Sequence, residues 1–243
     1  MVLKTVAIVQ ARMGSTRLPG KVMNTIKDKT VLGHVIARLK KVKEIDEIVI
    51  ATTKLSQDDI IEKEAHLHGV SVYRGSEQDV LARYYEAACE YQANHIVRIT
   101  SDCPLIDPGV TSKIVDFYLN HSFDYVSNCI VRSYPRGLDT EVFSYKSLER
   151  ASKETTLQEQ REHVTPYIYQ NRSLFSVYDF IGEHDHSYYR WTVDTIEDFK
   201  LVSAIYDELY EEDFCFGWDK TLELMKQNPT LSLINSHIEQ KKI

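Results

Sequence analysis

Residues 6–21 read VAIVQARMGSTRLPGK, and this stretch decides the fold that we expect. The apolar run Val6–Val9 predicts a buried parallel strand. Glycine and proline interrupt the segment that follows, which predicts a loop at the carboxyl end of that strand. Open α/β sheets bind their ligands at this end of their strands. The opening of the chain therefore predicts an α/β fold with a functional loop after its first strand.

The loop after this strand concentrates groups that bind phosphate. Glycines let the backbone approach a ligand closely, hydroxyls and backbone N–H groups donate hydrogen bonds, and cations neutralise a triphosphate. A solvated basic turn is the alternative interpretation. The placement directly after a buried strand favours the phosphate site. The residues concerned are Arg12, Gly14, Ser15, Thr16, Arg17, Gly20 and Lys21.

A Walker A loop is the obvious competitor for this segment. It requires four residues between its glycines and a serine or threonine after its lysine. Here five residues separate Gly14 from Gly20, and Val22 follows Lys21. The spacing therefore disfavours a P-loop kinase.

The rest of the chain alternates apolar strand patterns with helical ones, which predicts a mostly parallel sheet with helices on both faces. We expect a Rossmann-like, three-layer α/β fold in a single domain over residues 1–243. The region 130–185 departs from this alternation and predicts a small antiparallel extension or dimer arm. The predicted strands are 6–9, 47–51, 70–73, 95–100, 124–127, 141–143, 174–178 and 190–193. The predicted helices are 32–39, 56–68, 79–91, 108–118, 156–170, 195–205 and 219–227.

Three of these helices begin with a sequence typical of a capping box. In a capping box, the first side chain and the one three residues later satisfy each other's backbone N–H groups. The three pairs are Ser56 with Asp59, Thr156 with Glu159, and Thr195 with Asp198.

Two aspartates end predicted core strands. Asp102 follows the strand at 95–100, and Asp194 follows the strand at 190–193. Strand ends on one edge of a parallel sheet converge, so both carboxylates can meet over one ligand. One or two carboxylates together with phosphate oxygens are typical ligands of Mg²⁺. The alternative is that each aspartate caps a helix or forms a turn.

Other strand ends at the same edge are candidates for recognising a nucleotide base. Strand-end backbone groups, hydroxyls and a guanidinium can read the edge of a small pyrimidine. Thr52 and Thr53 are equally plausible as turn residues. Asp79, which follows this segment, can simply help to start the next helix. The candidate nucleotide-binding residues outside the loop are Ala11, Ala51, Thr52, Thr53, Arg74, Gly75, Ser76, Ser101 and Asp102.

Composition limits the partners of the chain. The net charge of -7 over 243 residues argues against a nucleic-acid surface, which needs a concentrated basic patch. Cys89, Cys103, Cys129 and Cys215 include no C-x-x-C pair, and free thiols fit the cytoplasm. No apolar run approaches the roughly 20 residues of a membrane span. We therefore expect a cytoplasmic protein with neither nucleic-acid nor membrane partners.

Seven segments together resemble the cytidylyltransferase family that includes the KDO and acylneuraminate cytidylyltransferases. They resemble most closely the branch of the spore coat polysaccharide biosynthesis protein F, and they span about four fifths of the chain in the same order. The segments are VQARMGSTRLPGK (9–21), IVIATT (48–53), YRGSEQDVLARYYEAA (73–88), VRITSDCPLIDP (97–108), PRGLDTEVF (135–143), REHVTPYIY (161–169) and YRWTVDTIED (189–198).

The resemblance implies roles for the loop and the two aspartates. It implies a nucleotidyltransferase fold in which Arg12, Gly14, Ser15, Arg17 and Lys21 embrace the phosphates of CTP. It also implies that Asp102 and Asp194 bind the metal, so the expected catalytic residues are Arg12, Lys21, Asp102 and Asp194. KDO relatives carry glutamate where this chain has Cys103, so the details at that position are not transferred.

The resemblance further implies a sugar-binding side. An arginine is the expected partner of a sugar-acid carboxylate. His163 is equally plausible as a structural histidine. The stretch Glu183–His186 resembles a metal cluster but fits a solvated loop better. The sugar-side residues are Arg136, Asp139, Glu141, Arg161, His163 and Arg190.

The resulting hypothesis is a Mg²⁺-dependent transfer of CMP from CTP to a nonulosonic or KDO-like sugar acid, with release of pyrophosphate, for surface or spore coat polysaccharide synthesis. The resemblance also implies a homodimer. A metal-dependent glycosyltransferase is an alternative, although Ser101-Asp102-Cys103 lacks the Asp-x-Asp pair typical of that class. A catalytically silent nucleotide-binding partner is a second alternative.

Overall fold

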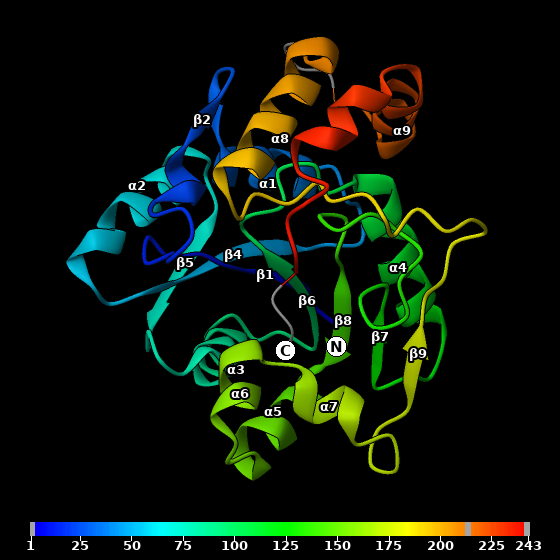
Figure 1. Ribbon diagram of the computed structural model, residues 1–243. Coiled ribbons are helices and arrows are strands. Elements are labelled where there is room, and N and C mark those ends of the chain that lie inside the picture. The colour runs from blue at the N-terminus through cyan, green and yellow to red at the C-terminus, as the bar shows by residue number, and fades with distance from the viewer. Residues whose placement is uncertain (1–2, 212–214, 241–243) are drawn as a thin grey trace.

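Strand β1 (Thr5–Gln10) lies inside the main sheet of the computed structural model, which describes residues 3–211 and 215–240 (Figure 1). Over these residues the main sheet has seven strands in the order β5-β4-β1-β6-β8-β7-β9. The ends of the predicted single domain, residues 1–2 and 241–243, lie outside the described residues.

The parallel half of the sheet follows the predicted alternation. β1 pairs in parallel with β4 (Glu47–Thr53) and with β6 (His95–Thr100), and β4 pairs in parallel with β5 (Ser71–Gly75). Because parallel strands end at the same edge, the segments after β1, β4 and β6 all begin at one rim of the sheet.

Alternating side chains of β1 enter two separate cores, as the period of a strand requires. One core contains Ala7 and Val9 with helices α1 (Val31–Leu39), α2 (Asp59–Leu67) and α4 (Pro108–Asn120). The other contains Val6 and Ile8 with α3 (Val80–Glu90) and α5 (Tyr145–Glu154). The sheet is therefore the middle of three layers, as predicted.

The antiparallel part belongs to the main sheet. β8 (Glu141–Ser144) runs antiparallel to both β6 and β7 (Tyr125–Ser127), and β9 (Val177–Asp179) pairs in parallel with β7 at the edge. The hairpin of β2 (Thr25–Ile26) and β3 (Lys29–Thr30) forms a separate small sheet that the sequence did not predict.

A third core lies under helices α8 (Ile196–Leu209) and α9 (Trp218–Gln227) at the top of Figure 1. Buried Trp191 and Val193 belong to it, and the short helix η3 (Pro229–Ile234) packs against α8 and α9. The predicted capping box of Thr195 and Asp198 begins α8.

The other two predicted capping boxes are wrong. The predicted helix 56–68 starts as a 3-10 turn, η2 (Ser56–Asp58), before α2. Asp58 precedes α2 without a side-chain capping bond, because its carboxylate instead accepts hydrogen bonds from the Met13 N–H and the Thr53 hydroxyl.

The predicted helix 156–170 is two short helices, α6 (Gln158–His163) and α7 (Pro166–Gln170). Val164 between them has a φ of 72°, a left-handed conformation that a helix cannot continue through, and Pro166 begins the next helix. Leu157, not Thr156, is the N-cap residue of α6.

The predicted strand 190–193 does not join the sheet. In the described chain, Arg190 forms an isolated bridge with Arg136, and the residues after it continue without strand pairing. Gly137 allows this approach. Its φ is 105°, and a Cβ at this position would lie 2.7 Å from the backbone carbonyl of Trp191.

We predict that Gly137→Ala lowers the free energy of unfolding by about 3 kcal/mol, because it adds both a strained φ and a backbone clash. Gly69→Ala is the matched control, since Gly69 has a φ of 62° but nothing lies within 4 Å of its added Cβ. We expect that control to cost about 1 kcal/mol. Urea denaturation measures both values, and equal losses would contradict the account of Gly137.

Candidate active site

The loop of residues 11–20, for which the sequence predicts phosphate binding, leaves β1 and folds back over the rim of the sheet. Met13 anchors it: its carbonyl accepts hydrogen bonds from the N–H groups of Ser15 and Gly20, at 2.8 and 3.1 Å. Its own N–H donates to Oδ1 of Asp58 at 2.8 Å. Gly20 adopts a φ of 69°, which directs the chain into the short helix η1 (Lys21–Met23). The loop is thus fixed at the carboxyl end of β4 as well as of β1.

Lys21 joins the loop to both predicted metal-binding aspartates. Its Nζ lies 2.7 Å from Oδ2 of Asp102 and 2.7 Å from Oδ1 of Asp194. Arg17 contacts Asp194 as well, with Nη2 at 3.0 Å from Oδ2. The structure therefore gathers the cationic loop and two aspartates that are distant in sequence.

Asp194 reaches this place by a route that differs from the predicted one. The backbone of its segment docks directly on Asp102: the Val193 N–H and the Thr192 hydroxyl donate to the Asp102 carbonyl, at 2.7 and 3.0 Å. Arg190 then donates to Oδ2 of Asp194 at 2.7 Å. Asp194 is held at the rim by these bonds and not by a strand.

Burial and charge oppose each other at this cluster. Burial by itself raises the pKa of Asp102, but the Lys21 ammonium outweighs it and lowers the pKa to about 2. Burial by itself lowers the pKa of Lys21, but Asp102 and Asp194 outweigh it and raise that pKa above its ordinary value. Lys21 and Asp102 are therefore held in their charged forms at neutral pH.

Cys103 stands where KDO relatives carry glutamate. Burial, reinforced by the charge of Asp102, raises the pKa of this thiol well above its ordinary value. Its Sγ lies 3.2 Å from the Thr100 hydroxyl and 3.5 Å from Oδ1 of Asp102. Cys103 thus supplies a neutral neighbour to Asp102 instead of a third carboxylate.

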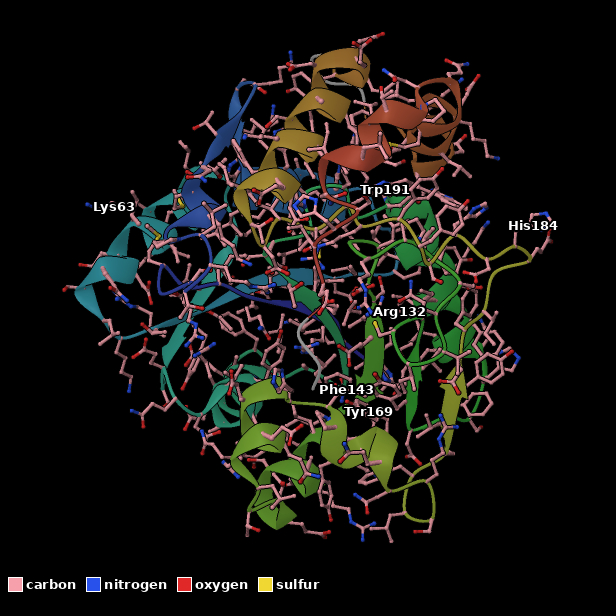
Figure 2. All side chains as sticks on the ribbon, in the orientation of Figure 1. Lys63, Arg132, Phe143, Tyr169, His184 and Trp191 are labelled. Atoms are coloured by element: carbon pink, nitrogen blue, oxygen red, sulfur yellow. The ribbon has the colours of Figure 1, made fainter. Side chains whose placement is uncertain are left out.

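A cavity of about 830 Å³ opens beside the cluster. Arg17, Asp102 and Asp194 line it, together with the ends of β1 and β6. Figure 2 shows Arg132, another lining residue, in the middle of the molecule above Phe143 and Tyr169. The remaining lining residues are Gln10, Arg98, Thr100, Cys103, Tyr125, Cys129, Ile130, Arg136, Asp139, Glu141, His163, Thr165, Tyr169, Thr192 and Gln240.

Four of the six predicted sugar-side residues line this cavity: Arg136, Asp139, Glu141 and His163. Asp139 forms a two-pronged ion pair with Arg132, at 2.7 and 3.0 Å.

Glu141 is committed to a buried network in the floor of the cavity. Arg98 donates to Oε1, and the hydroxyls of Tyr125 and Thr165 donate to Oε2 at 2.7 and 2.5 Å. These bonds occupy both carboxylate oxygens, so Glu141 is better suited to shape the cavity than to accept from a ligand.

The other two predicted sugar-side residues have different places. Arg161 pairs with Asp79 at 2.6 Å and donates to the carbonyls of Ser152 and Thr155, which fixes α6 against α3 outside the cavity lining. Arg190 is buried, and its guanidinium is bound by Asp194 and by Asp198, which lies 2.9 Å from Nε. Arg190 therefore positions Asp194.

The predicted base-reading residues are mostly engaged by the protein itself. The Arg74 guanidinium pairs with Asp59 at 2.7 Å and Glu62 at 2.9 Å and donates to two backbone carbonyls. Gly75 packs against Arg83, and the Ser76 hydroxyl accepts from the Asp79 N–H at 3.1 Å.

Thr52 is different from its neighbours. Its buried hydroxyl has no hydrogen-bond partner within the described residues, whereas the Thr53 hydroxyl donates to Asp58. A buried hydroxyl without a partner is unfavourable unless a ligand supplies one. Thr52 therefore stays a candidate for reading the base. Ala51 contributes its carbonyl, which accepts from the Ala11 N–H at 3.2 Å.

Sequence reasoning missed several residues of the site. Asp58 was hidden in an expected helix start, and Arg132 lies in the region 130–185 that had no clear pattern. Gln240 follows η3 on the segment that crosses the front of the sheet in Figure 1, and it accepts a hydrogen bond from Arg190. No local signal marks it, because its place depends on tertiary packing.

The exposed residue His184 lies at the tip of an outlying loop in Figure 2. Across residues 3–211 and 215–240, no group of three or more His, Cys, Asp or Glu side chains is arranged to hold a metal ion. Within the same ranges, no helix is long and apolar enough to cross a membrane.

The mostly parallel α/β sheet is a fold of nucleotidyltransferases, and the comparisons with known proteins place the chain in that class of enzyme. The chain belongs to the cytidylyltransferase family, whose sequence model, described as Cytidylyltransferase, matches residues 6–242. This confirms the resemblance seen in the sequence. The general reaction is the transfer of CMP from CTP.

Individual relatives agree with this family. An uncharacterised protein of Methanocaldococcus jannaschii is 40% identical, with 98% of this chain and 97% of the relative covered. The spore coat polysaccharide biosynthesis protein SpsF of Bacillus subtilis is 32% identical, with 91% and 94% covered. The structure of a cytidylyltransferase from Leptospira borgpetersenii is 37% identical with a TM-score of 0.91, and 99% and 100% of the two chains are covered.

The low pKa of Asp102 predicts a specific loss of stability in acid. The folded pKa of about 2 lies below the ordinary 3.8, so the stabilisation is complete above the ordinary value and disappears as pH falls through the folded one. By pH 3 wild-type protein should lose about 1 kcal/mol that Asp102→Asn does not lose. Urea denaturation between pH 6 and pH 3 measures the difference. Exposed Asp116→Asn is the control. A pH-independent gap between wild type and Asp102→Asn contradicts the assignment.

Proposed function

We propose that this protein transfers CMP from CTP to a sugar acid, with Mg²⁺ and with release of pyrophosphate. One observation carries the proposal: Lys21 connects the phosphate loop to Asp102 and Asp194 at a cavity that also contains a cluster of arginines. The general reaction of the family requires two substrates, and the polar cavity beside this cluster supports one site for both of them.

The loop supplies the positive charge that a triphosphate needs. Arg12 and Arg17 are exposed, and Lys21 begins η1 behind them. Negative charge accumulates on the departing pyrophosphate, so cations fixed along it favour the transition state. The backbone bonds through Met13 keep the loop in place, which lowers the cost of orienting the phosphates.

Two carboxylates that share one cation fit Mg²⁺. This ion is usually bound by one or two carboxylates together with substrate phosphates, and not by a complete protein cage. Asp102 and Asp194 would hold it, and when bound it would neutralise charge on the phosphates and act as a Lewis acid. Arg190 keeps Asp194 oriented for this task.

Arg136 is the best candidate for binding the acidic group of the acceptor. It is partly buried in the cavity lining and forms no ion pair with any carboxylate of the described chain. Burial and the neighbouring charge of Arg132 lower the pKa of Arg136. An acceptor carboxylate would relieve this unfavourable environment, whereas Arg132 already has Asp139.

The alternatives fit less well. A glycosyltransferase has no need for a triphosphate loop, and a silent binding partner has no need for two metal-binding carboxylates. Mg²⁺ as the particular ion, a homodimer, the cytoplasm and a role in spore coat or other surface polysaccharide remain predictions. The sequence similarity to SpsF supports the role in polysaccharide synthesis.

A pyrophosphate-release screen tests the proposal. It pairs each of the four nucleoside triphosphates with sugar acids and with matched neutral sugars, with and without Mg²⁺. We expect release with CTP, a sugar acid and Mg²⁺ together, and at least a hundredfold loss in Asp102→Asn. Turnover of neutral sugars as fast as of sugar acids would refute the acidic acceptor.

Arg136→Met refines that screen. We expect its KM for the sugar acid to rise about tenfold or more with little change in the KM for CTP. Arg150→Met is the control, because Arg150 lies on α5 and pairs with Glu154 outside the cavity lining. An unchanged sugar KM in Arg136→Met would exclude Arg136 as the carboxylate partner.

A further inference from the structure

The Lys21 ammonium occupies the point at which the two aspartates converge. It contacts one oxygen of each, Oδ2 of Asp102 and Oδ1 of Asp194, both at 2.7 Å. The side chain of Lys21 is only 11% exposed, and those of Asp102 and Asp194 are 21% and 12% exposed. These two oxygens therefore share one cation in this structure, the Lys21 ammonium.

The second oxygen of each aspartate is bound elsewhere. Oδ1 of Asp102 faces the Cys103 thiol at 3.5 Å, and Oδ2 of Asp194 accepts from Arg190 at 2.7 Å and contacts Arg17 at 3.0 Å. The protein therefore leaves one oxygen of each acid for a shared cation. In this structure that cation is the lysine ammonium.

A divalent ion and the ammonium cannot both take this point. Without any cation, two nearby carboxylates of low exposure repel each other, so Lys21 stabilises the nucleotide-free protein. A metal that replaced it would leave a cation of low exposure without its carboxylate partners, which is costly. A triphosphate removes that cost, because its oxygens accept hydrogen bonds from the displaced ammonium and neutralise its charge.

Lys21 is suited to such an exchange, and Arg190 is not. A lysine carries a compact charge on a flexible stem with several rotatable bonds, and Lys21 stands at the start of η1 directly behind the loop. The Arg190 guanidinium is fixed by Asp194 and Asp198, and its backbone carbonyl accepts from Asn235. Lys21 can therefore move while Arg190 continues to hold Asp194.

We propose that Lys21 is an internal counter-ion that keeps divalent metal out of the nucleotide-free protein. It releases Asp102 and Asp194 when a nucleoside triphosphate binds, so metal and nucleotide bind cooperatively. This inference rests on the proposed function for its metal ligands. Beyond that function, the proposal states that the nucleotide-free protein has little affinity for the metal. It also states that the Lys21 side chain determines the cooperativity between metal and nucleotide.

Mn²⁺ binding to nucleotide-free protein, measured by electron paramagnetic resonance, tests the proposal without any turnover. We expect Lys21→Met to bind Mn²⁺ about tenfold or more tightly than wild type does. Lys21→Arg retains a cation and should bind weakly, like wild type. Lys63→Met is the matched control, because Lys63 is exposed on α2 at the periphery of the molecule (Figure 2).

The same Mn²⁺ measurements with a non-hydrolysable CTP analogue test the cooperativity. The analogue should tighten Mn²⁺ binding about tenfold or more in wild type and by a clearly smaller factor in Lys21→Met. If Lys21→Met does not fold, Lys21→Gln replaces it in both comparisons.

Equal Mn²⁺ affinities of nucleotide-free wild type and Lys21→Met, whether tight or weak, overturn the proposal. The proposal is also overturned if the CTP analogue binds to wild type but leaves its Mn²⁺ affinity unchanged. A protein that binds no CTP contradicts the proposed function instead. The nucleotide-free comparison still decides the role of Lys21 in that case.

Discussion

The contact of Lys21 with Asp102 and Asp194 is the constraint on which the rest of the site depends. It unites a loop near residue 20 with acids that follow 81 and 173 residues later. Each supporting feature holds one of its three members. Asp58 and Met13 fix the loop, strand β6 carries Asp102 to the rim, and Arg190 with Asp198 orients Asp194. The fold thus concentrates charge at one place and neutralises it there.

Further charged side chains line the same cavity. At the rim, carboxylates and cations alternate and are largely paired with one another. Elsewhere in the lining, Arg132 is paired with Asp139 and Arg98 with Glu141, whereas Arg136 has no such pairing in the described structure. The proposed function assigns the first group of residues to phosphates and metal and the second to an acidic acceptor, so that one cavity would orient both reactants.

The sequence pattern predicted the features that depend on neighbouring residues, such as the ends of buried strands. Val6–Val9 and the strand before Asp102 are buried runs followed by turn residues, so their ends could be placed from sequence. Asp194 lies where it was expected for a different reason, since Val193 docks on the Asp102 backbone without forming a strand. Arg74, Arg161 and Arg190 have other partners than the predicted ones, because long cationic side chains pair with carboxylates that only tertiary packing brings near. Val164 likewise adopts a left-handed conformation that no helical pattern reveals.

The most direct test of this account is a crystal structure with CTP and Mn²⁺, in which anomalous scattering locates the metal. The account predicts one manganese ion in contact with a carboxylate oxygen of Asp102, a carboxylate oxygen of Asp194 and the nucleotide phosphates, with the Lys21 ammonium moved onto those phosphates. A manganese ion bound away from either aspartate, or phosphates bound away from the loop of residues 10–21, would contradict it.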